Sequence, residues 1–151
     1  MLRNFDNRLN ADVIRCLRAM GHGDDLVIAD TNFPSDSTAR KTLTGKLLRM
    51  DNLTAAEAIE AILTVFPLDA FVEHPVARMG ITGDEQKVLP VHAEVQKVVD
   101  KAEGKSTPLG IESRFDFYER ANDAYAVIVT GETRFYGCFI LKKGVIPPRE
   151  G

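Results

Sequence analysis

Helical patterns and short strand-like runs alternate along the first two-thirds of this chain, and this alternation constrains its fold more than any other feature. After Asn10, a good N-cap, apolar residues recur at helical spacing as far as Met20, and Gly21 is expected at the C′ position. Short apolar runs at 26–29 and 46–50 are typical of strands. The alternation predicts an α/β layer sandwich whose sheet is at least partly parallel.

The rest of the chain continues this pattern. The capping box that begins at Thr54 predicts a helix that stops before Pro67, and residues 31–37 are expected to form a polar loop. Further elements are expected as strands at 70–72 and 76–79, a helix from Pro90 to the break at 104–108, a strand at 110–113, a short helix at 115–121, and strands at 125–130 and 135–141.

Composition excludes several classes of function. The 151 residues fit one domain, which we expect to span 1–151, and the net charge of −3 does not favour a nucleic-acid surface. No run approaches the roughly 18 apolar residues of a membrane span, and the first residues lack the apolar core of a signal peptide. Only two cysteines occur, Cys16 and Cys138, which favours a reducing, cytoplasmic compartment.

The segment 20–34 holds the strongest candidate chemistry. His22 lies between Gly21 and Gly23 just after a helix, and Asp30 closes the following strand. Histidine exchanges protons near neutral pH, and α/β sheets bind ligands beyond the carboxyl ends of their strands. We therefore expect His22 and Asp30 to meet in one acid–base pocket. The alternatives are that His22 is an ordinary loop histidine and that Asp30 orders an Asx turn.

The last third of the chain supplies further polar groups. Arg114 offers a rigid fork of donors to ligand hydroxyls, and Tyr118 presents a ring face and a hydroxyl. The pair Tyr136-Gly137 indicates close approach of another group, such as a ligand, to the backbone. The alternatives are an ordinary amphipathic helix around Tyr118 and a bend or β-bulge at Gly137.

A metal or cofactor site is not expected. His22, His74 and His92 are scattered, and no pair of cysteines or histidines has the spacing of metal ligands. Cys16 falls within a helical pattern and Cys138 within a strand pattern, where a thiol usually serves as inert packing. The glycines form neither of the common nucleotide-binding loops.

Several blocks, in order along nearly the whole chain, resemble the RbsD/FucU family of sugar mutarotases and specifically its fucose branch. The matching blocks are Met20-Gly21-His22-Gly23-Asp24 with Asp30, Phe33-Pro34, Arg114-Phe115, Phe117-Tyr118-Glu119-Arg120, Val129-Thr130-Gly131-Glu132, Tyr136-Gly137 and Leu141-Lys142-Lys143-Gly144-Val145.

This resemblance implies a three-layer α/β/α sandwich with a mixed, partly parallel sheet. It also implies a homo-oligomer, a decameric ring of two pentamers, with pockets near the subunit interfaces. The implied activity is interconversion of the α and β anomers of a monosaccharide, L-fucose or a related sugar, without a metal or organic cofactor. The implied roles are proton donor for His22 and sugar contact for Asp30, Arg114, Tyr118, Tyr136, Gly137 and Cys138.

One residue departs from the family pattern, because Cys138 stands where the family usually has asparagine. Because of this change, a second function remains an alternative: a non-catalytic protein that binds sugar or assists its transport. A ribose-type pyranase is a further alternative. Arg114 weighs against it, since the ribose-type proteins usually carry histidine at that position.

Overall fold

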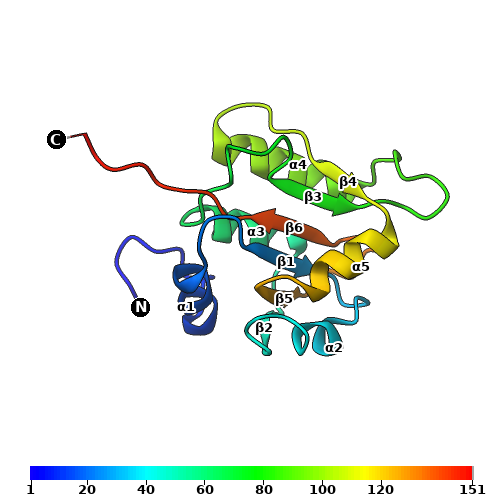
Figure 1. Cartoon of the computed structure of the whole chain (residues 1–151), viewed down its shortest axis with the longest axis horizontal. Coiled ribbons are helices and arrows are strands. Elements are labelled where there is room, and N and C mark those ends of the chain that lie inside the picture. The colour runs from blue at the N-terminus through cyan, green and yellow to red at the C-terminus, as the bar shows by residue number, and fades with distance from the viewer. Residues whose placement is uncertain (151) are drawn as a thin grey trace.

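The computed structural model describes residues 1–150, which form one six-stranded sheet of order β2-β5-β1-β6-β3-β4 between two layers of helices (Figure 1). The strands are β1 (Asp25–Ala29), β2 (Leu47–Met50), β3 (Val76–Met79), β4 (Gly110–Glu112), β5 (Ala126–Thr130) and β6 (Phe139–Lys142). Only β6 runs antiparallel to its neighbours, β1 and β3. The carboxyl ends of the other strands therefore share one edge with the start of β6.

Helices cover both faces of this sheet. One face carries α1 (Ala11–Ala19), α3 (Ala55–Leu63) and α4 (Pro90–Glu103), and the other carries α2 (Ser35–Ala39) and α5 (Arg114–Asn122). This arrangement confirms the expected three-layer α/β/α sandwich with a mixed sheet. Within residues 1–150, no helix combines the length and the apolar character needed to cross a membrane.

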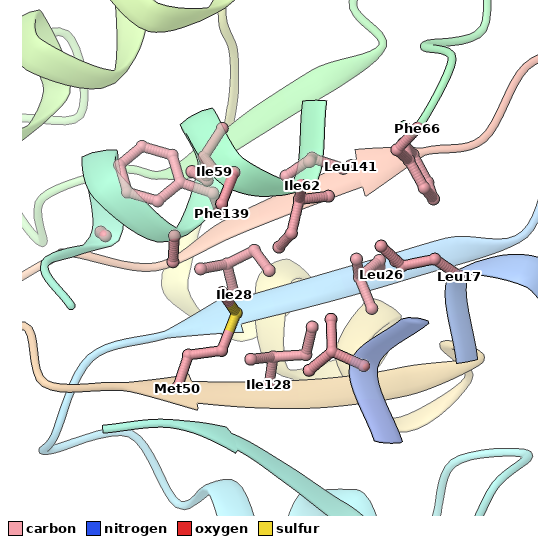
Figure 2. Close-up of a cluster of buried hydrophobic side chains, with 14 of the residues drawn as sticks. Leu17, Leu26, Ile28, Met50, Ile59, Ile62, Phe66, Ile128, Phe139 and Leu141 are labelled. Carbon is pink, nitrogen blue, oxygen red and sulfur yellow. The ribbon is translucent and has the colours of Figure 1, made fainter. Parts of the chain in front are cut away.

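Two apolar cores hold the layers together, and β1 contributes to both. Leu26 and Ile28 face the larger core under α1, α3 and α4 (Figure 2), whereas Val27 and Ala29 face the smaller core under α2 and α5. Successive side chains of a strand point to opposite faces, so a strand covered on both sides is apolar throughout. All four side chains are fully buried.

The helix ends follow the expected capping chemistry in three places. The Asn10 side chain accepts a hydrogen bond from the N–H of Val13 at 3.0 Å and begins α1. Thr54 and Glu57 form the reciprocal bonds of a capping box at the start of α3. Gly104, with φ of 69°, ends α4 in the left-handed conformation.

Three local expectations are wrong. Residues 35–39 form the short helix α2 instead of a loop. Residues 70–72 form no strand, because the Asp69 carboxylate accepts the N–H of Phe71 and turns the chain there. The last strand begins at Phe139 rather than at 135, since the preceding segment is a turn with a left-handed Tyr136.

Candidate functional site

A cavity of about 300 Å³ opens at the edge of the sheet where the carboxyl ends of β1 and β3 meet the start of β6. Asp30 follows β1 and Cys138 precedes β6, while α5 contributes Arg114 and Tyr118. The cavity is lined by Asp30, Asn32, Phe33, Met79, Arg114, Tyr118, Phe135, Tyr136 and Cys138. The structure thus brings together five residues that the sequence analysis singled out from three separate segments.

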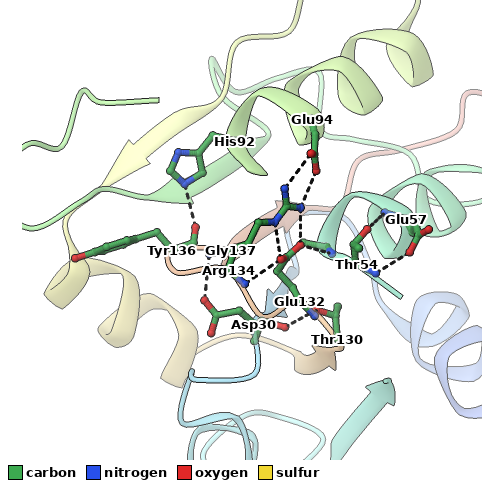
Figure 3. A network of polar contacts seen from close by, with 12 residues as sticks. Asp30, Thr54, Glu57, His92, Glu94, Thr130, Glu132, Arg134, Tyr136 and Gly137 are labelled. Carbon is green, nitrogen blue, oxygen red and sulfur yellow. Dashed lines mark hydrogen bonds and ion pairs between the residues drawn. The ribbon is translucent and has the colours of Figure 1, made fainter. Parts of the chain in front are cut away.

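Asp30 joins two loops at the base of the cavity. Its Oδ1 accepts the N–H groups of Asn32 at 3.0 Å and Phe33 at 2.9 Å, and its Oδ2 accepts the N–H of Gly137 at 3.1 Å (Figure 3). The Asx turn that was an alternative to a binding role is therefore present, and the same carboxylate also faces the cavity. Backbone donors hold Asp30 rigidly while it remains able to accept a ligand hydroxyl.

Tyr136 forms one wall of the cavity in an unusual backbone conformation. Its φ is 59°, a left-handed value that costs a non-glycine residue about 1–2 kcal/mol. Two contacts hold it: its carbonyl lies 3.0 Å from His92 Nε2, and its hydroxyl accepts the N–H of Thr82 at 3.3 Å. The next residue must be glycine, because a Cβ at Gly137 would approach Glu132 Cγ to 2.7 Å. Gly137 itself does not line the cavity.

The cavity combines free hydrogen-bond donors with an aromatic wall. Arg114 is exposed and forms no ion pair within residues 1–150, and its guanidinium lies 5.1 Å from the ring centre of Phe115. Tyr118 stacks on Phe33 with ring centres 5.5 Å apart and planes inclined by 30°. Pockets with this mixture of apolar surface and a few placed polar groups bind small organic ligands.

His22 lies at the opposite edge of the sheet, so the expected meeting of His22 and Asp30 within one chain is wrong. The His22 loop is attached to the end of β6, since the N–H of Gly23 donates to the carbonyl of Lys143 at 2.8 Å. The five residues of β1 then separate His22 from Asp30. A strand of that length spans about 16 Å at roughly 3.3 Å per residue, far beyond side-chain contact.

The partner of His22 in this chain is Asp69. His22 Nε2 lies 3.2 Å from Asp69 Oδ1, and the His22 side chain is 47% exposed whereas that of Asp69 is 4% exposed. The N–H of Phe71 also donates to Asp69, and together with His22 it holds the pKa of this carboxyl below its usual range. An ionised carboxylate that fixes one ring nitrogen can orient an imidazole and stabilise its protonated form. Nothing local in the sequence marks Asp69, because it is 47 positions from His22.

An apolar surface surrounds His22. The groove beside it has a volume of about 660 Å³ and includes Phe5, Leu17, Val145 and Ile146. Ile146 is 77% exposed, and Phe5 and Val145 are also exposed. At the other edge of the sheet, Phe115 and Phe135 are also largely exposed beside the cavity. Exposed apolar surface of this extent marks sites of contact with other molecules.

The other histidines and the two cysteines form no metal site. His74 contacts the carbonyl of Pro108 at 3.0 Å, and His92 is buried behind the cavity. Both cysteines are free and buried, and burial raises the pKa of Cys16 to about 11 and that of Cys138 above its usual value. In the part of the chain that the structure describes, no group of three or more His, Cys, Asp or Glu side chains is placed to hold a metal ion.

Known proteins resemble the chain over nearly its full length. Fucose mutarotase of Bos taurus is 39% identical over 153 residues, which covers 99% of this chain and 97% of the relative. The solved structure of protein Atu2016 is 60% identical with a TM-score of 0.95 and covers 97% of each chain. The fucose mutarotase of Streptococcus pneumoniae, solved in complex with L-fucose, is 34% identical with a TM-score of 0.85 and covers 97% of this chain and 100% of that one.

The family model described as "RbsD / FucU transport protein family" matches residues 3–146. This match covers both the cavity and the His22 loop. The chain therefore belongs to the RbsD/FucU family.

Proposed function

We propose that this protein is a mutarotase that interconverts the α and β anomers of L-fucose or a closely related monosaccharide. The observation that carries the proposal is the cavity, where Asp30, Arg114 and Tyr118 present acceptors and donors beside an aromatic wall. A monosaccharide has the matching chemistry, with hydroxyls around its rim and apolar C–H groups on its faces. The likeness to a fucose mutarotase solved with L-fucose supports the same substrate class.

The reaction requires one acid and one base. A base removes the proton of the anomeric hydroxyl while an acid protonates the ring oxygen, and the bond between C1 and that oxygen breaks to give the open aldehyde. Rotation about C1–C2 and the reverse transfers close the other anomer, so protons and electrons balance. General acid–base catalysis typically contributes about 10²–10⁴-fold, which is enough for a reaction that already proceeds in water.

We assign to His22, oriented by Asp69, the donation of a proton to the ring oxygen, while solvent water accepts the proton of the anomeric hydroxyl, and on ring closure the two transfers reverse. We assign sugar binding to the cavity. Asp30 accepts a sugar hydroxyl, Arg114 and Tyr118 donate to others, and Tyr136 and Cys138 shape the wall. Gly137 contributes through its N–H, which holds Asp30 in place.

Because His22 and the cavity lie at opposite edges of one sheet, we infer that a complete site forms between two copies of the chain. His22 of the partner subunit would approach the cavity, and the apolar groove around it would pack against the exposed Phe115 and Phe135. An interface between two different surfaces of the same chain is heterologous, and such contacts form a ring when the rotation between neighbouring copies closes. We propose a decamer of two five-membered rings, with residues 1–151 as one domain in the cytoplasm.

The test is saturation-transfer NMR of the exchange between L-fucose anomers. We expect the wild-type protein to speed exchange and His22→Ala to lower the catalysed rate by about 10²-fold or more. His74→Ala is the matched control, because His74 is a partly exposed histidine away from the cavity. Equal rates for wild type and His22→Ala would overturn the assignment of His22.

A non-catalytic sugar-binding protein is the second candidate, and Cys138 is the observation that favours it. Its buried thiol stands beside Asp30 where the family usually carries asparagine. Tight binding of L-fucose without faster exchange would support this candidate, and Cys138→Asn would then be expected to introduce exchange. A parallel NMR assay of the exchange between the pyranose and furanose forms of D-ribose distinguishes a ribose-type pyranase from a fucose mutarotase.

A further inference from the structure

His92 lies behind the wall of the cavity at the start of α4 and is only 1% exposed. Both of its ring nitrogens contact the backbone: the N–H of Leu89 donates to Nδ1 at 3.1 Å, and Nε2 lies 3.0 Å from the carbonyl oxygen of Tyr136 (Figure 3). A nitrogen that accepts a hydrogen bond carries no proton, so the proton of the neutral ring is on Nε2. His92 therefore donates to Tyr136 and accepts from Leu89.

The carbonyl that receives this bond belongs to the left-handed residue of the cavity wall. A left-handed tyrosine persists only where its surroundings hold it. The Tyr136 hydroxyl is held by Thr82 and the following N–H by Asp30. Within the described residues, His92 supplies the hydrogen bond to the Tyr136 carbonyl itself, and it does so from a helix 44 positions away in the chain.

We propose that His92 is a positioning residue for the sugar cavity: its neutral imidazole ties the start of α4 to the backbone of Tyr136 and keeps that tyrosine on the cavity wall. A second proton, on Nδ1, would point at the N–H of Leu89 and break the bond at the helix start, whereas Nε2 would still donate to the Tyr136 carbonyl. Protonation therefore releases the start of α4, and loss of the Nε2 bond releases the turn that carries Tyr136. The inference deepens the proposed function, but its structural part does not depend on which sugar binds.

The charges around His92 favour the neutral form. Burial, with repulsion from Arg78 on β3, lowers the pKa of His92 below its ordinary value of 6.5. Arg78 is itself buried, and its guanidinium donates to the carbonyl of Glu85 at 3.1 Å. From β6, Phe139 presents an uncharged ring edge, and Glu94 on the same helix is already paired with Arg134.

The sign of the pH effect follows from this lowered pKa. Between 6.5 and the lower native value, the unfolded chain binds a proton at His92 that the native chain does not. Acidification through this window therefore favours opening of the bond between Leu89 and Nδ1. The contribution of His92 to stability is complete above that window and decreases as the pH falls through it.

Two substitutions separate the two bonds. In His92→Gln the amide nitrogen lies near the place of Nε2 and can donate to Tyr136, but the bond from Leu89 is lost. In His92→Asn the amide oxygen lies near the place of Nδ1 and can accept from Leu89, but the bond to Tyr136 is lost. His74→Asn is the control, because His74 contacts the Pro108 carbonyl outside the cavity.

Hydrogen–deuterium exchange of the full-length, assembled protein tests the link without any sugar. We expect His92→Asn to increase uptake in 134–138, His92→Gln to increase it in 88–93, and wild type below pH 6.5 to increase it in 88–93. Neither variant is expected to show the increase in 88–93 on acidification that wild type shows. Equal uptake increases throughout the chain in both variants would overturn the inference, because they would indicate general destabilisation.

The exchange of L-fucose anomers gives the second measurement. Loss of one hydrogen bond typically changes an equilibrium constant by about three- to tenfold. We therefore expect His92→Asn to raise KM by that factor, with a smaller effect on kcat. The KM of His92→Gln is expected to remain near that of wild type. If wild type shows no anomer exchange, the proposed function fails while the deuterium result still decides the role of His92. An unchanged KM in His92→Asn beside an active wild type would contradict the positioning role.

Discussion

His22 carries the proposed proton transfers, and its environment explains how one exposed imidazole can be held in a defined orientation. Asp69 is buried and ionised, and it contacts both His22 Nε2 and the N–H of Phe71. The backbone donor fixes the carboxylate, and the carboxylate fixes the ring. Within residues 1–150, the other ring nitrogen of His22 has no hydrogen-bond partner, and the ring lines the apolar groove.

Replacement of Asp69 tests this arrangement. Asp69→Asn keeps the shape of the side chain but replaces the carboxylate that orients the His22 ring with a weaker neutral partner, so we predict a fall in kcat of about tenfold with little change in KM. Anomer-exchange NMR at several fucose concentrations separates the two parameters. The control is Asp36→Asn, which changes an exposed carboxylate paired with Arg40. An unchanged kcat in Asp69→Asn would contradict the role assigned to Asp69.

At the scale of elements, β1 separates the two halves of the site, and ion pairs attach α5 to its start. Arg120 of α5 donates to both oxygens of Asp25 at 2.9 and 3.0 Å, and Lys142 of β6 contacts the same carboxylate. Burial opposes ionisation of Asp25, but these two cations outweigh it and lower its pKa below 3.8. The helix that supplies Arg114 and Tyr118 is thereby fixed to the central strand.

Loss of Arg120 is predicted to weaken this attachment. In Arg120→Leu the Asp25 carboxylate loses its main partner in a largely buried place, so we expect the free energy of unfolding at pH 7 to fall by about 2 kcal/mol. Because the native pKa of Asp25 is lowered, its stabilisation is present above pH 3.8 and is lost as the pH falls further. The difference in the free energy of unfolding between Arg120→Leu and wild type should therefore become smaller below pH 3.8.

Urea unfolding at several pH values measures this difference. The matched control is Arg40→Leu, which removes an exposed pair with Asp36 and should change the stability by less than about 0.5 kcal/mol. Equal losses in Arg120→Leu and Arg40→Leu would contradict the argument from burial.

Most elements were predictable because their signals are local. The helices α1, α3 and α4 have an apolar stripe and a recognisable N-terminal signal, so the spacing of the side chains identifies them. The helix α2 was missed because Ser35–Ala39 is a polar segment without such a stripe. The start of β6 was misplaced because the conformation of Tyr136 depends on His92 and Thr82, which are distant in sequence.

The sequence allowed us to predict which residues form the candidate site, but not how they are arranged in space. Asp30, Arg114, Tyr118, Tyr136 and Cys138 gather around one cavity, as the resemblance to the RbsD/FucU family implied. Within one chain, His22 does not meet Asp30, because the strand between them holds them apart. In the proposed assembly, His22 at one edge of the sheet acts on a sugar bound at the opposite edge of another copy. No local sequence pattern reveals such a contact between copies.

At the scale of the whole molecule, both edges of the sheet expose apolar side chains beside polar groups that the proposed reaction needs. One edge has His22 within an apolar groove, and the other has the cavity flanked by Phe115 and Phe135. Neither edge alone provides both the acid–base group and the sugar contacts. The central claim is therefore that a working site combines His22 of the partner subunit with this cavity.

Mixed assemblies test that claim most directly. Subunits with His22→Ala retain an intact cavity, and subunits with Arg114→Ala retain an intact His22. When the two variants are co-expressed in equal amounts, random assembly gives both intact parts to about a quarter of the sites in a heterologous ring. We predict that two nearly inactive variants together regain about a quarter of the wild-type rate of anomer exchange. A rate no higher than that of either variant alone, in assemblies that contain both by native mass spectrometry, would contradict the account.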